Sequence, residues 1–169
     1  MVQLAQDSIY NVLKDAEKEN DGDSIVLLHD GVRPFVSYDT IKQNIESVQK
    51  YGSAITCTAC YETILLSKSG EKVDSVPIVK IHLRTGPQSF RLKDIIAAHD
   101  EVRAINPSYE NMVDACTIMT TLGKEVHMIS GNRGNIKVTT PEDVYMFRAL
   151  LNYKENEQTF GIGLTNGIR

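Results

Sequence analysis

The fold of this chain is indicated by one stretch, Ser24-Ile25-Val26-Leu27-Leu28-His29-Asp30-Gly31-Val32-Arg33-Pro34-Phe35. Its apolar first half is typical of a strand that is buried on both faces of a parallel sheet. The strand is predicted to stop just before Asp30, after which glycine and proline turn the chain. Because open α/β sheets bind ligands at the carboxyl ends of their strands, Asp30 is the first residue that we expect in a functional site.

Composition narrows the class of protein. The 169 residues suit one domain with a sizeable core, and the net charge of -4 argues against a protein that binds nucleic acid. No apolar stretch approaches the roughly 20 residues that span a bilayer, and the N-terminus does not resemble a signal peptide, so we expect a cytoplasmic protein without a membrane partner. The cysteines suit reduced thiols, and we interpret Cys57 and Cys60 as small buried residues rather than a redox or zinc pair.

Alternating patterns predict an α/β fold. Apolar residues at a helical period predict a helix over 9–16, ahead of the strand over 24–28. A second helix is expected from Ser37, a good N-cap, to Gly52, a good C-terminal residue, and a buried strand over 54–59 follows. This order of elements favours a mostly parallel sheet with right-handed crossovers.

The middle of the chain predicts an arm. Two β-prone runs flank the polar segment 67–72, which indicates an exposed hairpin over 63–79. Such an arm covers a site or pairs with another subunit, unless it is simply a mobile surface hairpin. Beyond it, helices are expected over 92–102 and 112–122, and a strand over 125–130.

The sequence after residue 131 predicts a last helix. Thr140 is a good N-cap, Pro141 suits the first helical position, and Asp143 stands where the acid of a capping box belongs. From Lys154 onwards apolar residues are few, so 154–169 is predicted to be a loose tail.

Three segments together resemble one family. They are the strand end His29 to Phe35, a turn at Gly86-Pro87-Gln88-Ser89-Phe90 and a strand at Asn135-Ile136-Lys137-Val138-Thr139. In this order and spacing they are similar to the 2-C-methyl-D-erythritol 4-phosphate cytidylyltransferases and their relatives, the D-ribitol 5-phosphate cytidylyltransferases. The resemblance implies a Rossmann-like nucleotidyltransferase fold over residues 1–153, with a protruding arm at about 61–80 and a separate tail at 154–169.

The resemblance also implies an activity. Such enzymes form a CDP-alcohol and pyrophosphate from CTP and a sugar-alcohol phosphate, in isoprenoid biosynthesis or in teichoic acid or capsule biosynthesis. The acceptor phosphate attacks the α-phosphorus of CTP in line, so catalysis rests on positioning and charge neutralisation. A divalent ion, usually Mg²⁺, bridges the phosphates and needs carboxylate ligands, and Asp30 matches the metal-binding aspartate of the family. The sequence at residues 88–90 and 139–143 is slightly more similar to the ribitol phosphate branch of the family.

Residues of the nucleotide side are implied one at a time. Arg33 matches an arginine that neutralises or orients phosphate, a role that suits its planar fork. Gly31 and Val32 are expected to let the main chain approach the nucleotide. Ser8 aligns with a serine that touches the nucleotide, although a helix N-cap is an equal alternative.

Residues of the acceptor side follow in the same way. Lys137 matches a lysine that holds the acceptor phosphate against the α-phosphorus, so Lys137 and Arg33 are the expected catalytic residues. The alternative for Lys137 is a solvated lysine at the sheet edge. Asp114 matches an acid near the acceptor hydroxyls, and an acid that merely favours a helix start would look the same.

The acceptor side also departs from the family pattern. Ile78 stands where the family has an arginine that steadies the acceptor phosphate. Lys80, or Arg84, is expected to take over this contact if the arm shifts its register. Gly86 and Val113 stand in place of threonines, which puts two contacts to acceptor hydroxyls in doubt.

A larger departure is an absence from the sequence. The chain has no Gly-rich loop with Arg and Lys, which in the family cradles the CTP triphosphate. We expect the first two βα units, on the order of 60 to 80 residues, to be missing, and the chain by itself to be inactive. The unpaired sheet edges that this leaves, together with the arm, predict a homodimer formed through the arm.

Two hypotheses therefore stand side by side. In the first, the chain is a cytidylyltransferase polypeptide that binds CTP and a sugar-alcohol phosphate, and the DNA upstream of Met1 should encode the Gly-rich loop. In the second, the chain is a non-catalytic remnant that acts as a dimerisation or partner-binding module. Use of a nucleotide other than CTP also stays open, because residues that read the base belong largely to the missing part.

Overall fold

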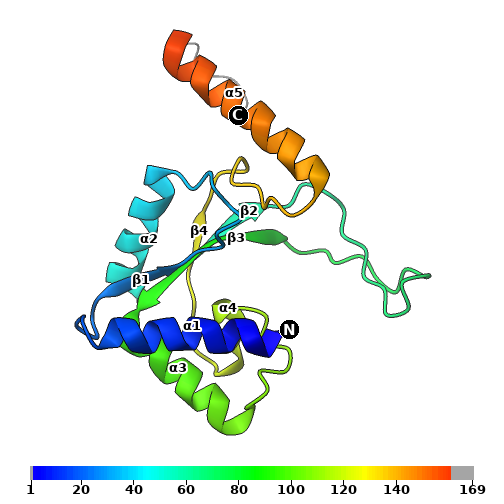
Figure 1. The fold of residues 1–169 in the computed structure, drawn as a ribbon. Coiled ribbons are helices and arrows are strands. Elements are labelled where there is room, and N and C mark those ends of the chain that lie inside the picture. The colour runs from blue at the N-terminus through cyan, green and yellow to red at the C-terminus, as the bar shows by residue number, and fades with distance from the viewer. Residues whose placement is uncertain (1, 161–169) are drawn as a thin grey trace.

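A four-stranded sheet forms the centre of the computed structural model, which describes the backbone of residues 2–160 and the side chains of 5–156. The strands are β1 (Ile25–Leu28), β2 (Ser53–Ala59), β3 (His82–Arg91) and β4 (Met128–Ser130), in the spatial order β1-β3-β2-β4. β2 and β4 pair in parallel, whereas β3 runs antiparallel to both β1 and β2 (Figure 1). The α/β class is confirmed, with a sheet that is partly parallel because β3 lies reversed between two strands of like direction. The strand expected after Ser24 is present, but the prediction that it is buried in a parallel sheet is wrong, because β1 is a half-buried edge strand antiparallel to β3.

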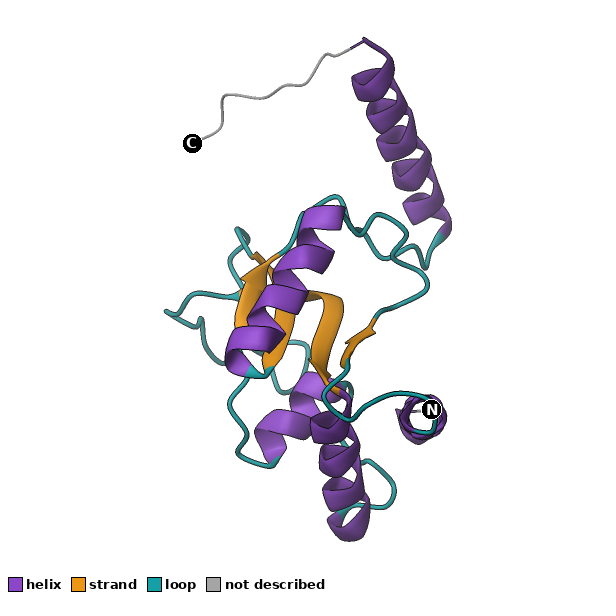
Figure 2. Cartoon of the chain, turned by 90° about the vertical axis from the view of Figure 1, so that its left-hand side faces the viewer, coloured by secondary structure: helices purple, strands orange, loops and turns teal. Residues whose placement is uncertain are grey.

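The described residues also form helices around this sheet. They are α1 (Val2–Glu17), α2 (Tyr38–Tyr51), α3 (Leu92–Ile105), α4 (Ala115–Thr121) and α5 (Pro141–Phe160). α2 lies against the sheet, α1 runs beside α3, and α5 projects away from the rest (Figures 1 and 2). None of the described helices is long and apolar enough to cross a membrane.

Local sequence explains where the helices begin and end. The Ser37 hydroxyl accepts a hydrogen bond from the Thr40 N–H at the start of α2, and Gly52 ends that helix at a φ of 80°. Thr140 and Asp143 form a capping box at α5, because the Asp143 carboxylate accepts from the Thr140 N–H while the Thr140 hydroxyl accepts from the Asp143 N–H. The predicted caps at Ser37, Gly52 and Thr140 are confirmed.

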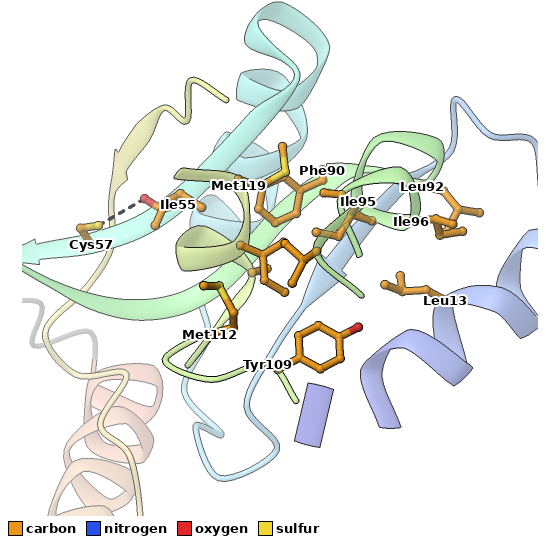
Figure 3. Packing of buried hydrophobic residues seen from close by; sticks show 14 residues of the cluster. Leu13, Ile55, Cys57, Phe90, Leu92, Ile95, Ile96, Tyr109, Met112 and Met119 are labelled. Carbon is orange, nitrogen blue, oxygen red and sulfur yellow. Dashed lines mark hydrogen bonds between the residues drawn. The ribbon is translucent and has the colours of Figure 1, made fainter. Parts of the chain in front are cut away.

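The two faces of the sheet have different chemistry. Ile55, Cys57 and Phe90 join the apolar core that α3 and α4 complete (Figure 3). On the opposite face, the buried Asn44 of α2 donates to the Thr56 hydroxyl at 2.9 Å and accepts from the Ser89 hydroxyl at 2.8 Å. Because neighbouring residues of a strand point to opposite faces, one register satisfies both the apolar core and the polar network.

The turn predicted at residues 86–90 is wrong, because this motif lies inside strand β3. Ile55 faces Gln88 and Cys57 faces Arg84, so an advance of two residues along β2 matches four along β3. Gly86 sits in this bulge at a φ of 73°, a left-handed conformation that glycine adopts without steric cost. The turn-like composition therefore marks a bulge that re-aims the side chains on either side of it.

Other predicted boundaries also shift. Residues 135–139 form no strand. Their main-chain groups bond to Val32, Arg33, Asn132 and Asp143, none of which lies in a strand. The strand expected over 125–130 is reduced to β4, and the helix expected over 112–122 begins only after its cap, Asp114. The tail predicted from residue 154 is wrong up to Phe160, because α5 continues through it; residues 161–169 lie outside the described part.

The predicted arm leaves the sheet between β2 and β3 and projects into solvent (Figure 1). Its two sides are joined by an antiparallel bridge between Leu66 and Ser75. At the tip, the Ser67 hydroxyl accepts a hydrogen bond from the Gly70 N–H. The chain reversal is confirmed, while the pairing is short because the arm has no core to pack against. Its apolar side chains are strongly exposed, as at Ile78 with 98%.

A histidine is fully buried where α1 meets α3. His99 has no exposed surface, and its Nδ1 lies 3.0 Å from the hydroxyl oxygen of Tyr109. Burial, assisted by the nearby Arg103 charge, lowers the pKa of His99 from 6.5 to about 4. The folded protein therefore keeps this imidazole neutral at a pH at which the unfolded chain protonates it.

We expect the free energy of unfolding to fall as the pH drops from 6.5 towards 4. In this window the unfolded chain binds a proton that the folded chain excludes. The free energy of unfolding therefore falls by at most about 1.4 kcal/mol for each pH unit. Urea unfolding at a series of pH values checks this. His99→Asn should reduce the dependence of the free energy of unfolding on pH. His82→Asn, at an exposed position, should leave that dependence unchanged. Equal slopes for His99→Asn and the unmodified protein would contradict the assignment.

Candidate active site

The three segments that carried the family resemblance meet in space. The guanidinium of Arg33 donates through Nη1 to the carbonyl oxygen of Asn135 at 2.9 Å. The buried side chain of Asn135 donates in turn to the carbonyl oxygen of Gly86 at 3.3 Å. A third bond runs from the Val138 N–H to the Val32 carbonyl oxygen at 2.8 Å. Residues far apart in sequence are thus joined at one end of the sheet.

Asp30 and Arg33 form an ion pair just beyond β1. Arg33 Nε donates to Asp30 Oδ2 at 3.1 Å, and their side chains are 12% and 32% exposed respectively. His29 supports the same turn, since its Nε2 lies 2.8 Å from the Arg33 carbonyl oxygen. His29 itself stays exposed. The carboxylate is oriented by its arginine and remains open to ligand.

Asp30 opens onto a cavity of about 430 Å³ between α1, β1, β3 and the start of α4. Its polar lining includes Ser8, Asp30, Arg84 and Asp114, and the α1 side adds apolar residues. Because α1 begins at Val2, Ser8 lies within the helix and is not its N-cap. The predicted nucleotide residues Ser8 and Asp30 thus share one cavity with the predicted acceptor residue Asp114.

Asp114 caps α4 and is engaged on both oxygens. Its Oδ1 accepts from the N–H and the hydroxyl of Thr117, each at 2.8 Å, and its Oδ2 lies 2.6 Å from Arg84 Nε. The side chain is 13% exposed. Asp114 is therefore the cap of α4 and also lines the cavity, while its contact with acceptor hydroxyls stays a prediction. The ion pair with Arg84 was not foreseen, because it crosses from β3 to α4 and leaves no trace in local spacing.

Other predicted site residues lie differently. Lys137 is exposed and has no ion pair within the described residues, and Lys80 lines a separate groove at the base of the arm. Around Gly31 there is open space on the side where a Cβ would lie. Among the described lysines and arginines, Arg84 rather than Lys80 lines the cavity. Neither Lys80 nor Lys137 lines the cavity that contains Asp30 and Asp114.

The cysteines are not prepared as nucleophiles or ligands. Burial raises the pKa of both Cys57 and Cys116, which keeps these thiols protonated near neutral pH. Cys57 is buried as predicted, while Cys60 is only half-buried. Among the described residues, no group of three or more His, Cys, Asp or Glu could hold a metal ion.

One protein carboxylate is available to a divalent ion at the proposed position. Asp30 uses Oδ2 for Arg33, and the same carboxylate lines the cavity. Mg²⁺ is commonly bound by one or two carboxylates together with waters and substrate phosphates. The donor set therefore fits an ion that arrives with a nucleotide, and does not fit a tightly held structural metal.

Residues 3–153 match the family model of IspD, 2-C-methyl-D-erythritol 4-phosphate cytidylyltransferase. The chain belongs to this cytidylyltransferase family. The match spans α1, the whole sheet, the arm and the first part of α5. The family recognised from three short motifs is thus confirmed.

Curated relatives of the chain carry a related name. A ribitol-5-phosphate cytidylyltransferase of Vibrio parahaemolyticus is 40% identical, over 94% of this chain and 66% of the relative. A ribitol-5-phosphate cytidylyltransferase of Streptococcus agalactiae is 37% identical, over 95% of this chain and 66% of the relative. The chain thus spans about two thirds of the length of these cytidylyltransferases.

Solved structures agree with the fold. The 2-C-methyl-D-erythritol 4-phosphate cytidylyltransferase of Francisella tularensis superposes with a TM-score of 0.75 at 26% identity, over 86% of this chain and 66% of that one. The 4-diphosphocytidyl-2C-methyl-D-erythritol synthase of Anaerococcus prevotii gives a TM-score of 0.72 at 29% identity, over 87% and 63%. The nucleotidyltransferase fold is therefore established for this cytidylyltransferase chain.

We expect Gly86→Ala to destabilise the cytidylyltransferase chain by about 1–2 kcal/mol, because an L-residue must enter the left-handed region there. A new Cβ would also lie 3.6 Å from His29 Nδ1. Urea unfolding measures the loss. Gly31→Ala is the matched control, since its Cβ would meet no atom within 4 Å and its φ is not left-handed. Equal stability of the two variants would show that the bulge does not need glycine.

Proposed function

We propose that this chain carries the metal- and acceptor-binding side of a CTP-dependent cytidylyltransferase that acts on a sugar-alcohol phosphate. The observation that carries the proposal is that Asp30, which pairs with Arg33, and Asp114, which pairs with Arg84, line one cavity at the carboxyl end of β1. The products would be a CDP-alcohol and pyrophosphate. Membership of the family supports the reaction class.

D-Ribitol 5-phosphate is the acceptor that we propose. The relatives at 37–40% identity are named for ribitol 5-phosphate, whereas the superposed structures named for the methylerythritol compound are 26–29% identical. The polar wall formed by Asp114 and Arg84 suits a molecule rich in hydroxyl groups. We propose the cytoplasm, where CTP is available, as the compartment.

The charge of each residue indicates the part of the substrates that it would bind. Asp30 would hold a divalent ion, which when bound neutralises phosphate charge. Arg33 is held by Asp30 and by the Asn135 carbonyl, and its remaining terminal nitrogen makes no hydrogen bond to the described residues, so it can bind phosphate. Lys137 is exposed and would hold the acceptor phosphate. A phosphate oxygen of the acceptor would bond to the α-phosphorus as the bond to pyrophosphate breaks.

Turnover by this chain alone is not expected. Its sequence contains no Gly-rich loop with Arg and Lys to cradle the triphosphate. Each lost charge-assisted hydrogen bond is worth roughly 1.5–3 kcal/mol. We also propose a homodimer formed through the arm, supported by its exposed apolar side chains, among them Ile78 and Val79. A non-catalytic module would use the same arm and differ in having no nucleotide site.

Calorimetric titration with CTP separates the enzyme from the non-catalytic module. We expect weak binding that requires Mg²⁺, because an ion held by Asp30 would neutralise phosphate charge that the carboxylate alone would repel. Titrations with CTP alone, with CTP and Mg²⁺, and with D-ribitol 5-phosphate cover both halves of the site. A chain that binds neither compound under any of these conditions would contradict the proposed function.

Replacement of the metal-binding carboxylate gives a second prediction. Asp30→Asn should abolish the Mg²⁺-dependent part of CTP binding, since an amide is a far weaker ligand for this hard cation. Asp23→Asn is the matched control, because Asp23 precedes the same strand but pairs with Lys93 away from the cavity. If both variants bind CTP and Mg²⁺ as the unmodified chain does, Asp30 is not the metal ligand.

A further inference from the structure

We propose that Arg84, with Asp114, reads a hydroxyl group of the acceptor alditol and so determines acceptor specificity; this inference rests on the proposed function. Neither residue acts alone. Arg84 Nε lies 2.6 Å from Asp114 Oδ2, and both side chains line the cavity that Asp30 enters. This ion pair joins strand β3 to the N-cap of α4 in the wall of the cavity.

The carboxylate half of the pair is held rigidly. Asp114 Oδ1 accepts two hydrogen bonds from Thr117, and Gln88 on the same strand as Arg84 accepts a bond from the Cys116 N–H at 2.7 Å. β3 is therefore fastened to α4 at two points, on either side of its bulge. A rigid wall of this kind orients a ligand better than a mobile side chain does.

The guanidinium half keeps donors for a ligand. Arg84 is 31% exposed, and its side chain makes no hydrogen bond to any other described residue. With Nε next to Asp114, its terminal N–H groups remain for an acceptor oxygen. A second lone pair on Asp114 Oδ2 is available beside them. The wall of the cavity thus presents a donor and an acceptor next to each other, which is the pattern that a hydroxyl group matches.

The charge of each residue indicates whether it binds the hydroxyl groups or the phosphate of the acceptor. Arg84 is already neutralised by Asp114 at 2.6 Å, so its attraction for a dianion is small. Lys137, in contrast, has no ion pair within the described part of the chain. The phosphate is therefore assigned to Lys137, and the polyol end of the ligand to the Arg84–Asp114 pair. A ligand without hydroxyl groups would cover this partly buried pair and leave its remaining donors and acceptor without partners.

Titration of Arg84→Met with two probes tests the assignment. The dissociation constant for D-ribitol 5-phosphate should rise by about tenfold to a hundredfold, while that for inorganic phosphate stays unchanged. Arg84→Lys, which keeps the charge but loses the fork, should recover only part of the affinity. Arg91→Met is the matched control: Arg91 lies on the same strand with 30% exposure, pairs with Asp23 and does not line the cavity.

The outcomes separate this inference from the proposed function. If the unmodified chain binds D-ribitol 5-phosphate and Arg84→Met binds it equally well, the role of Arg84 is refuted and the function stands. If Arg84→Met weakens both probes equally, Arg84 binds phosphate and the inference is again wrong. If the unmodified chain binds neither probe, both fail. Should Arg84→Met unfold, the double variant Arg84→Met/Asp114→Asn removes the unpaired charge and is titrated in its place.

Discussion

Asn135 connects the loops on which the whole site depends. Its carbonyl oxygen accepts a hydrogen bond from Arg33, and its side chain, 3% exposed, donates to the carbonyl oxygen of Gly86. Buried polar groups that lose their partners are costly, so both bonds constrain the chain strongly. They form together only when the loop after β1, the bulge of β3 and the segment after β4 are all in place. The orientation of Arg33, and through it of Asp30, follows from this constraint.

The bulge in β3 is the second determinant of the site. Gly86 allows the strand to take up two extra residues relative to β2 without breaking the sheet. On one side of it Arg84 reaches Asp114, and on the other Gln88 reaches the Cys116 N–H. The polar network of Asn44, Thr56 and Ser89 fixes the register of the opposite face. A strand held on both faces can therefore carry an irregular stretch beside the cavity.

The cavity combines two carboxylates, each balanced by its own arginine. Asp30 pairs with Arg33 and Asp114 with Arg84, so the chain without ligand carries little uncompensated charge there. A metal and a phosphate would bring opposite charges to the first pair, whereas hydroxyl groups would suit the second. This division matches a family whose substrates contain both a phosphate and a polyol. The proposed binding of anionic ligands by an acidic protein, with a net charge of -4, would rest on this local pairing of charges.

Much of the fold and part of the site followed from sequence alone. Helical periodicity and capping residues such as Ser37 and Thr140 act over a few neighbouring residues, so they could be recognised locally, as could the apolar run before Asp30. The family could be recognised from three motifs. Only the tertiary structure decided that Gly86 lies in a strand, that residues 135–139 pair with loops, and that Arg84 meets Asp114. Each of these depends on contacts between segments distant in the chain, whose energies no local pattern contains.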